Sequence, residues 1–156
     1  TSCPTANVAT ASLHGVTVGV PEGWVDDSVL RFMSPVDESD PVVSSGFTQN
    51  VVVTSHAVPD SVPMAKVFEA PNRAAKSQTN DFEVLGSGEC QYLGQSAVYQ
   101  DVTFSDPRVN TVLCQRQLAL KAENGLVVIL TMTSDKNRFK KASAAFPVEA
   151  QPSKKR

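Results

Sequence analysis

The stretch of residues 95–134 constrains the fold most, because it contains three extended runs in direct succession. The first run ends at the turn signal Ser105-Asp106-Pro107-Arg108, and the second ends at Glu123-Asn124-Gly125. Proline sets the φ angle of a turn, and Asn-Gly accepts positive φ, so both signals indicate tight connections between antiparallel neighbours. The stretch therefore predicts a three-stranded meander that forms the core of the sheet.

The pattern of apolar residues assigns the faces of this meander. Residues 109–122 predict a long strand with one apolar face that is interrupted by Arg116. An arginine in that position needs an acidic partner, for which Asp101 and Glu89 are the candidates, or it lines a cavity. Residues 126–133 are apolar on both faces, which is typical of a central strand covered on both sides.

Flanking segments extend the meander into an α+β domain. Further strands are predicted at residues 13–20, 29–33, 50–58 and from residue 82 to a bend at Gly86-Ser87-Gly88. A helix is predicted at residues 61–79, with a kink or a division near Ala70 caused by Pro71, and another at residues 135–146. The sequence thus predicts an antiparallel sheet of about six to seven strands with helices packed on its faces.

Length and composition favour one domain. A chain of 156 residues with 41% hydrophobic residues can bury a core of its own. Residues 1–12 are small and polar and predict a flexible N-terminal lead-in, residues 13–147 predict the α+β domain, and residues 148–156 predict a disordered basic tail. Residues 34–49 predict a long surface loop, since they are rich in proline and acidic residues.

Charge and hydropathy exclude two classes of partner. The 14 basic and 16 acidic residues give a net charge of −2, so we expect no nucleic-acid binding. No apolar run approaches the ~20 residues that a membrane-spanning helix needs. The chain begins without Met and without a signal-peptide pattern, so we expect a trimmed or mature form whose targeting signal is absent.

The cysteines leave their pairing open. The chain has three of them, Cys3, Cys90 and Cys114, so at least one is unpaired within the chain or modified. Cys90 and Cys114 are the candidate disulfide, although simple hairpins would place them two strands apart, roughly 10 Å. No CxxC motif is present and there are only two histidines, so we expect no metal site and no cofactor.

Catalytic motifs do not emerge from the sequence. It contains no GxSxG nucleophile elbow, and its acidic residues are scattered apart from one cluster in the predicted loop. Cysteines in predicted strands are usually inert core residues. We therefore expect a protein that is not an enzyme.

The order of several short segments resembles the LpqN/LpqT family of actinobacterial lipoproteins. The resemblance covers residues 15–146, within the wider Mog1/PsbP fold group. Its segments are Val20-Pro21-Glu22-Gly23-Trp24, residues 35–43, Ala65-Lys66-Val67, residues 82–88 with Leu93-Gly94, and residues 125–133. The resemblance implies an extracytoplasmic or secreted protein of a mycolate-bearing cell envelope, often anchored by a lipidated N-terminal cysteine. Cys3 follows Thr1-Ser2, whereas such a cysteine would begin the mature chain.

Two functions follow as hypotheses. The first is a non-catalytic envelope protein that binds an apolar or trehalose-type glycolipid ligand or assists envelope lipid assembly. Its ligand would lie between sheet and helices, near Trp24, Phe68, Tyr99 and Arg116. The alternative is a protein–protein interaction module without a small-molecule ligand. We expect a monomer whose partner is a glycolipid or an envelope protein, with membrane contact only through a lipid anchor.

Overall fold

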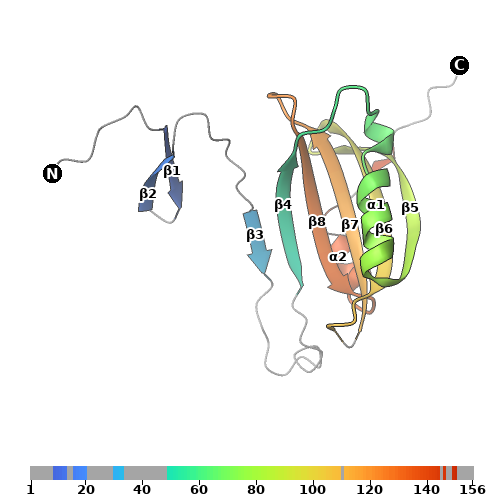
Figure 1. Ribbon diagram of the computed structural model, residues 1–156. Coiled ribbons are helices and arrows are strands. Elements are labelled where there is room, and N and C mark those ends of the chain that lie inside the picture. Colours follow the sequence, from blue (N-terminus) through green and yellow to red (C-terminus); the bar gives the residue numbers. More distant parts are fainter. Residues whose placement is uncertain are drawn as a thin grey trace, which may run out of the picture.

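A seven-stranded antiparallel sheet forms the body of the protein, as a computed structural model shows (Figure 1). The structure describes residues 9–13, 16–20, 30–33, 49–109, 111–144, 146 and 149–150. The spatial order is β3-β4-β8-β7-β6-β5-β9, and every neighbouring pair is antiparallel. The strands are β3 (Leu30–Met33), β4 (Asn50–His56), β5 (Asn80–Tyr92), β6 (Gln95–Ser105), β7 (Val112–Lys121), β8 (Val127–Asp135) and β9 (Glu149–Ala150). This arrangement confirms the predicted α+β class and its antiparallel sheet.

The predicted meander is the centre of that sheet. Strands β6, β7 and β8 pair in sequence order, as the two turn signals predict. Gly125 has φ +81°, a left-handed conformation that glycine adopts without steric cost. The register differs from a simple hairpin centred on Asp106-Pro107: Asp101, and not Ala97, lies opposite Arg116. The difference arises because the turn is longer, with β7 beginning only at Val112.

The first predicted helix is divided, as Pro71 indicates. A 3-10 helix, η2 (Met64–Lys66), is followed by α1 (Glu69–Gln78), so the break falls at residues 67–68. Pro71 lies in the first turn of α1, where its missing N–H costs no intrahelical bond.

The last helix, α2 (Phe139–Ser143), is shorter than the predicted helix over residues 135–146. Asp135 belongs to β8, and its carboxylate accepts from the N–H groups of Asn137 and Arg138. It therefore caps the turn that precedes α2.

The two faces of the sheet carry separate cores, because α1 and α2 lie on opposite sides of it (Figure 1). We call them the α1 face and the α2 face. The buried residues of the α1-face core are Val67, Phe68, Val98, Ala119, Val127 and Ile129. The α2-face core has Cys90, Ala97 and Leu118, with Tyr92, Tyr99, Leu120, Leu130 and Phe146 packed against them. Both faces of β8 are used, as its apolar sequence predicts.

Two short strand segments lie where the sequence predicts none. Strand β1 (Ala9–Leu13) begins inside the predicted lead-in and pairs with β2 (Val16–Val20). A two-stranded ribbon therefore replaces the single strand predicted at residues 13–20. Strand β9 lies inside the predicted disordered tail and pairs with Cys90 and Gln91 of β5. Neither segment shows the alternation that marks a half-buried strand across its full length, so the sequence pattern misses both.

The turn between β5 and β6 offers a stability test. Leu93 and Gly94 both have positive φ, 48° and 78°, as a type I′ turn requires, and Leu93 is 86% exposed. The left-handed conformation is unfavourable for leucine and is tolerated by asparagine. We expect Leu93→Asn to raise the free energy of unfolding by about 0.5–1 kcal/mol in urea titrations. Leu85→Asn, at a second exposed leucine without positive φ, should bring no gain.

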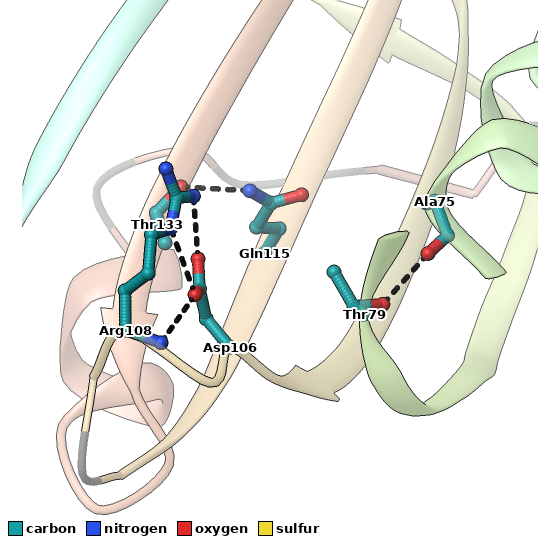
Figure 2. Close-up of polar contacts among 6 residues, drawn as sticks. All are labelled: Ala75, Thr79, Asp106, Arg108, Gln115 and Thr133. Carbon is teal, nitrogen blue, oxygen red and sulfur yellow. Dashed lines mark hydrogen bonds and ion pairs between the residues drawn. The ribbon is translucent and has the colours of Figure 1, made fainter. Parts of the chain in front are cut away.

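The turn between β6 and β7 offers a pH test. The Asp106 carboxylate accepts hydrogen bonds from the main-chain N–H of Arg108 at 2.8 Å, from its Nε at 3.0 Å and from its Nη2 at 2.7 Å (Figure 2). These bonds lower the pKa of Asp106 from 3.8 to about 2. Since the folded pKa is the lower one, the stabilisation is complete above about pH 4 and is lost as the pH falls towards 2. A carboxyl NMR titration should show this pKa, and Arg108→Ala should return it towards 3.8; an unchanged pKa in the variant would contradict the assignment.

Candidate functional site

The four predicted ligand-binding residues do not form one cluster. Phe68 is buried on the α1 face. Tyr99 and Arg116 point to the α2 face, where Tyr99 packs against the core and Arg116 is ion-paired. Trp24 lies outside the described residues. The sheet therefore separates Phe68 from Arg116, although both belong to regions between sheet and helix.

Arg116 holds the sheet and the C-terminal end of α2 together. Its Nε and Nη2 donate to the two carboxylate oxygens of Asp101, both at 2.9 Å, so the pair is bidentate. Its Nη1 donates to the carbonyl oxygens of Ser143 at 3.2 Å and Phe146 at 3.1 Å. Hydrogen bonding to Asp101 raises the pKa of Arg116. Asp101 is one of the two partners that the sequence suggests, and these contacts indicate a structural role.

The candidate disulfide between Cys90 and Cys114 is not formed, and both thiols are free and buried. Cys90 lies opposite Ala97 of β6, whereas Cys114 lies opposite Thr103. Six residues along a strand amount to roughly 20 Å, far beyond the ~7 Å limit between bonded cysteines. Burial raises the pKa of the Cys90 thiol, and the positive charge of Arg116, which lowers that pKa, offsets only part of the rise. This thiol is therefore a poor nucleophile. Cys3 lies outside the described residues.

A hollow lies on the α1 face. This groove, which we call the α1 groove, has a volume of about 400 Å³ and separates α1 from β5 and β6. The pairing of β5 with β6 is irregular between Asn80 and Gly86, just before the segment Gly86-Ser87-Gly88 at which the sequence predicts a bend. The lining residues are Ala65, Phe68, Glu69, Asn72, Val84, Ser87, Gly88, Glu89, Val98, Tyr99 and Gln100. Two predicted site residues, Phe68 and Tyr99, are therefore part of its lining.

Three side-chain amides form a network on the α1 face, and two of them, Asn72 and Gln100, line the α1 groove. Asn72 Nδ2 donates to Gln100 Oε1 at 2.9 Å, and Gln100 Nε2 donates back to Asn72 Oδ1 at 2.8 Å. Gln100 Nε2 also donates to Gln117 Oε1 of β7. Gln100 is only 2% exposed, so the network fixes its orientation. Asn72 uses one of its two Nδ2–H groups on Gln100, whereas Gln117 lies outside the groove lining.

Two carboxylates stand at the rim of the groove. Glu69 lies in the first turn of α1, and Glu89 lies on β5 opposite Val98. Both are exposed. A second hollow of about 360 Å³ shares Glu89 and Val98 with the α1 groove and reaches Lys121. The two hollows adjoin at Glu89 and Val98, and we call them the two lobes of the cleft.

The polar character continues across the α1 face. Gln115 of β7 donates to Thr133 Oγ1 of β8 at 3.1 Å, as Figure 2 shows. Gln115 and Gln117 alternate with the apolar residues of the opposite face of β7. This row of polar residues was not predicted, because the apolar residues of β7 dominate its sequence pattern. The available signal was Gln100, a polar residue between Val98 and Val102 on a face predicted to be buried.

A smaller and more apolar hollow lies on the other side of the sheet. It has a volume of about 220 Å³ between α2 and the strands β3 and β4. Its lining residues are Phe32, Met33, Gln49, Asn50, Val51, Met132, Thr133, Ala142 and Phe146. Phe32 is 60% exposed, so strand β3 presents an open apolar surface.

Comparison with solved structures shows that the chain shares a known fold. Protein PA94 of unknown function from Pseudomonas aeruginosa superposes with a TM-score of 0.65 at 20% identity, covering 88% of this chain and 90% of that one. The Ran-binding protein Mog1p of Saccharomyces cerevisiae has a TM-score of 0.50 at 14% identity, with 89% and 82% coverage. Cyanobacterial PsbP from Synechocystis has a TM-score of 0.50 at 12% identity, with 94% and 92% coverage. The chain therefore has a Mog1/PsbP-like fold, as predicted.

The narrower LpqN/LpqT resemblance stays a prediction. The structure of LpqN from Mycobacterium tuberculosis, described as involved in cell envelope biogenesis, has a TM-score of only 0.45 at 14% identity. No protein-family model matches the sequence. No curated protein matches it either. Within the part of the chain that the structure describes, no helix is long and apolar enough to cross a membrane.

Proposed function

We propose that this chain is a non-catalytic binding protein of the cell envelope that holds the sugar head of a trehalose-type glycolipid in the α1 groove. The observation that carries the proposal is the amide pair of Asn72 and Gln100 in the groove lining, which we call the amide floor, together with the carboxylates of Glu69 and Glu89. The envelope location is supported by the LpqN/LpqT resemblance of the sequence segments.

The hydrogen-bonding groups of the groove match hydroxyl groups. The second N–H of Asn72 Nδ2 can donate, and the carboxylates of Glu69 and Glu89 can accept. A sugar hydroxyl does both at once, so neighbouring hydroxyls can bridge an amide and a carboxylate. A volume of about 400 Å³ lies in the range of small-molecule sites. The groove is therefore suited to a polyhydroxylated group of one or two rings.

A thermal-shift titration tests this function. Trehalose and a trehalose monoester of a fatty acid should both raise the Tm, because a ligand that binds only the folded state stabilises it. At a ligand concentration of 100 times Kd the gain is about 2.7 kcal/mol, which corresponds to roughly 5–10 °C for a chain of this size. The absence of any shift across a panel of trehalose lipids would contradict the proposal.

A groove-filling variant locates the site. Ser87 is exposed on β5 opposite Gln100, so Ser87→Trp should fill the α1 groove and abolish the ligand-induced shift. Glu83→Trp, at an exposed position of the same strand outside the groove lining, is the matched control and should keep the shift. An equal shift in both variants would place the ligand elsewhere.

The second candidate function is a protein–protein interaction module. Leu30, Phe32 and Met33 of β3 are all more than half exposed, and β3 ends the strand order of the described sheet. Exposed apolar residues on an edge strand are typical of a contact surface. Cross-linking in envelope extracts discriminates between the two: a partner captured by the wild type and lost in Phe32→Lys, together with no ligand-induced shift, would favour the interaction module.

A further inference from the structure

We infer that Glu69 and Glu89 make the α1 groove selective by charge, so that it accepts uncharged hydroxylated ligands and rejects anionic ones. This inference rests on the proposed function and adds a rule for the ligand: sugars that carry phosphate, sulfate or carboxylate groups are excluded. The selectivity follows from the charges that line the cleft.

The charged residues that line the first lobe are both acidic. Glu69 projects from the first turn of α1, and Glu89 stands on the facing strand β5. An anionic group placed between them would meet two negative charges. Two unit charges 4 Å apart repel by about 1 kcal/mol in water and by more in a partly enclosed site. Two such repulsions outweigh a hydrogen bond from a neutral amide, which contributes about 1 kcal/mol.

The position of Glu89 extends this effect to the second lobe. Because Glu89 lines both hollows, a ligand that occupies the full cleft passes beside its carboxylate. Lys121 is the basic residue of the second lobe, and its Nζ lies 3.5 Å from Asp60 Oδ1. That pairing reduces the attraction that Lys121 offers to an anion.

Neutral hydroxyls avoid the penalty and benefit from the same residues. A hydroxyl donates to a carboxylate in a charge-assisted hydrogen bond, which is stronger than a neutral one. The amide floor supplies the opposite function through the second N–H of Asn72 Nδ2. The groove thus combines acceptors at its rim with donors at its floor, and the combination favours a neutral polyol.

Calorimetric titration with a matched pair of ligands tests the inference. The wild-type protein should bind trehalose at least about tenfold more tightly than trehalose 6,6′-bisphosphate at 20 mM salt. The ratio should shrink at 1 M salt, where the Debye length falls to about 3 Å. In the double variant Glu69→Gln/Glu89→Gln the two affinities should approach each other, because glutamine keeps the size and an acceptor oxygen but removes both charges.

A second double variant controls for net charge. Asp81→Asn/Glu83→Gln removes two exposed negative charges of β5 outside the groove lining and should keep the wild-type preference. Equal affinities of the wild type for both ligands, or a preference that persists in the groove variant, would overturn the inference and leave the proposed function standing. Absence of trehalose and trehalose-lipid binding would contradict the proposed function itself, and the charge rule would fall with it.

Discussion

Replacement of Arg116 by methionine is expected to lower the free energy of unfolding by about 3–5 kcal/mol, one of the two largest effects of a single substitution that we predict. The side chains of Arg116 and Asp101 are only 15% and 17% exposed. Removal of the guanidinium leaves the Asp101 carboxylate without its bidentate partner. It also removes both hydrogen bonds to the carbonyl oxygens of Ser143 and Phe146, which connect β7 to the end of α2. Chemical denaturation monitored by circular dichroism measures the change.

The double variant Asp101→Leu/Arg116→Met separates two contributions to the loss of stability. One is the unpaired Asp101 carboxylate, and the other is the loss of the hydrogen bonds from Arg116 to the end of α2. Since apolar residues often replace a buried pair at little cost, the double variant should recover most of the loss. The free energy of unfolding of Arg116→Lys should lie between those of Arg116→Met and the double variant, because an ammonium group cannot reproduce the bidentate geometry. A loss below about 1 kcal/mol for Arg116→Met would show that the pair contributes no more than an exposed ion pair does.

Truncation of Leu118 to alanine is expected to destabilise the protein by about 3 kcal/mol. Leu118 is completely buried in β7, between Tyr99 of β6 and Leu130 of β8 in the strand register, at the centre of the α2-face core. The substitution removes apolar contacts and leaves a cavity that the flanking strands cannot close. Thermal unfolding should show a fall in Tm of roughly 6–12 °C.

Leu93→Ala is the control for Leu118→Ala, because it deletes the same atoms at a position that is 86% exposed. Its effect on stability should stay within about 0.5 kcal/mol. Equal losses in the two variants would mean that the α2-face core does not determine stability. Both variants should be measured in one denaturation series, so that their free energies of unfolding are extrapolated to zero denaturant in the same way.

The sheet could be predicted from the sequence because its signals are local. Alternating apolar residues and the Asn-Gly turn determine β7 and β8 without reference to the rest of the chain. The same local reasoning placed Arg116 on an apolar face and named Asp101 as a candidate partner, which the structure confirms. It failed on the exact register of β6 and β7, since the length of the turn at residues 106–111 shifts the pairing by several residues.

The candidate site could not be predicted in the same way, because it depends on contacts between distant segments. Asn72 lies on a helix, whereas Gln100 and Gln117 lie on two strands, and only the packing of α1 on the sheet brings them together. Phe68 and Tyr99 both line the α1 groove, although Tyr99 also packs against the α2-face core. Arg116 was assigned to the same site because sequence patterns do not show which helix covers which face. The register reveals that it faces α2.

The most direct test of the account is an NMR titration that follows the side-chain amide signals of Asn72, Gln100 and Gln117 during the addition of trehalose or its monoester. Because Asn72 and Gln100 line the α1 groove and Gln117 is hydrogen-bonded to Gln100, a ligand held there should shift all three signals in a saturable manner. Ser87→Trp should abolish the shifts, and signals beside Arg116 on the α2 face should stay unchanged. Saturable binding with unchanged signals for all three amides would contradict the account, because the ligand would then occupy another part of the protein.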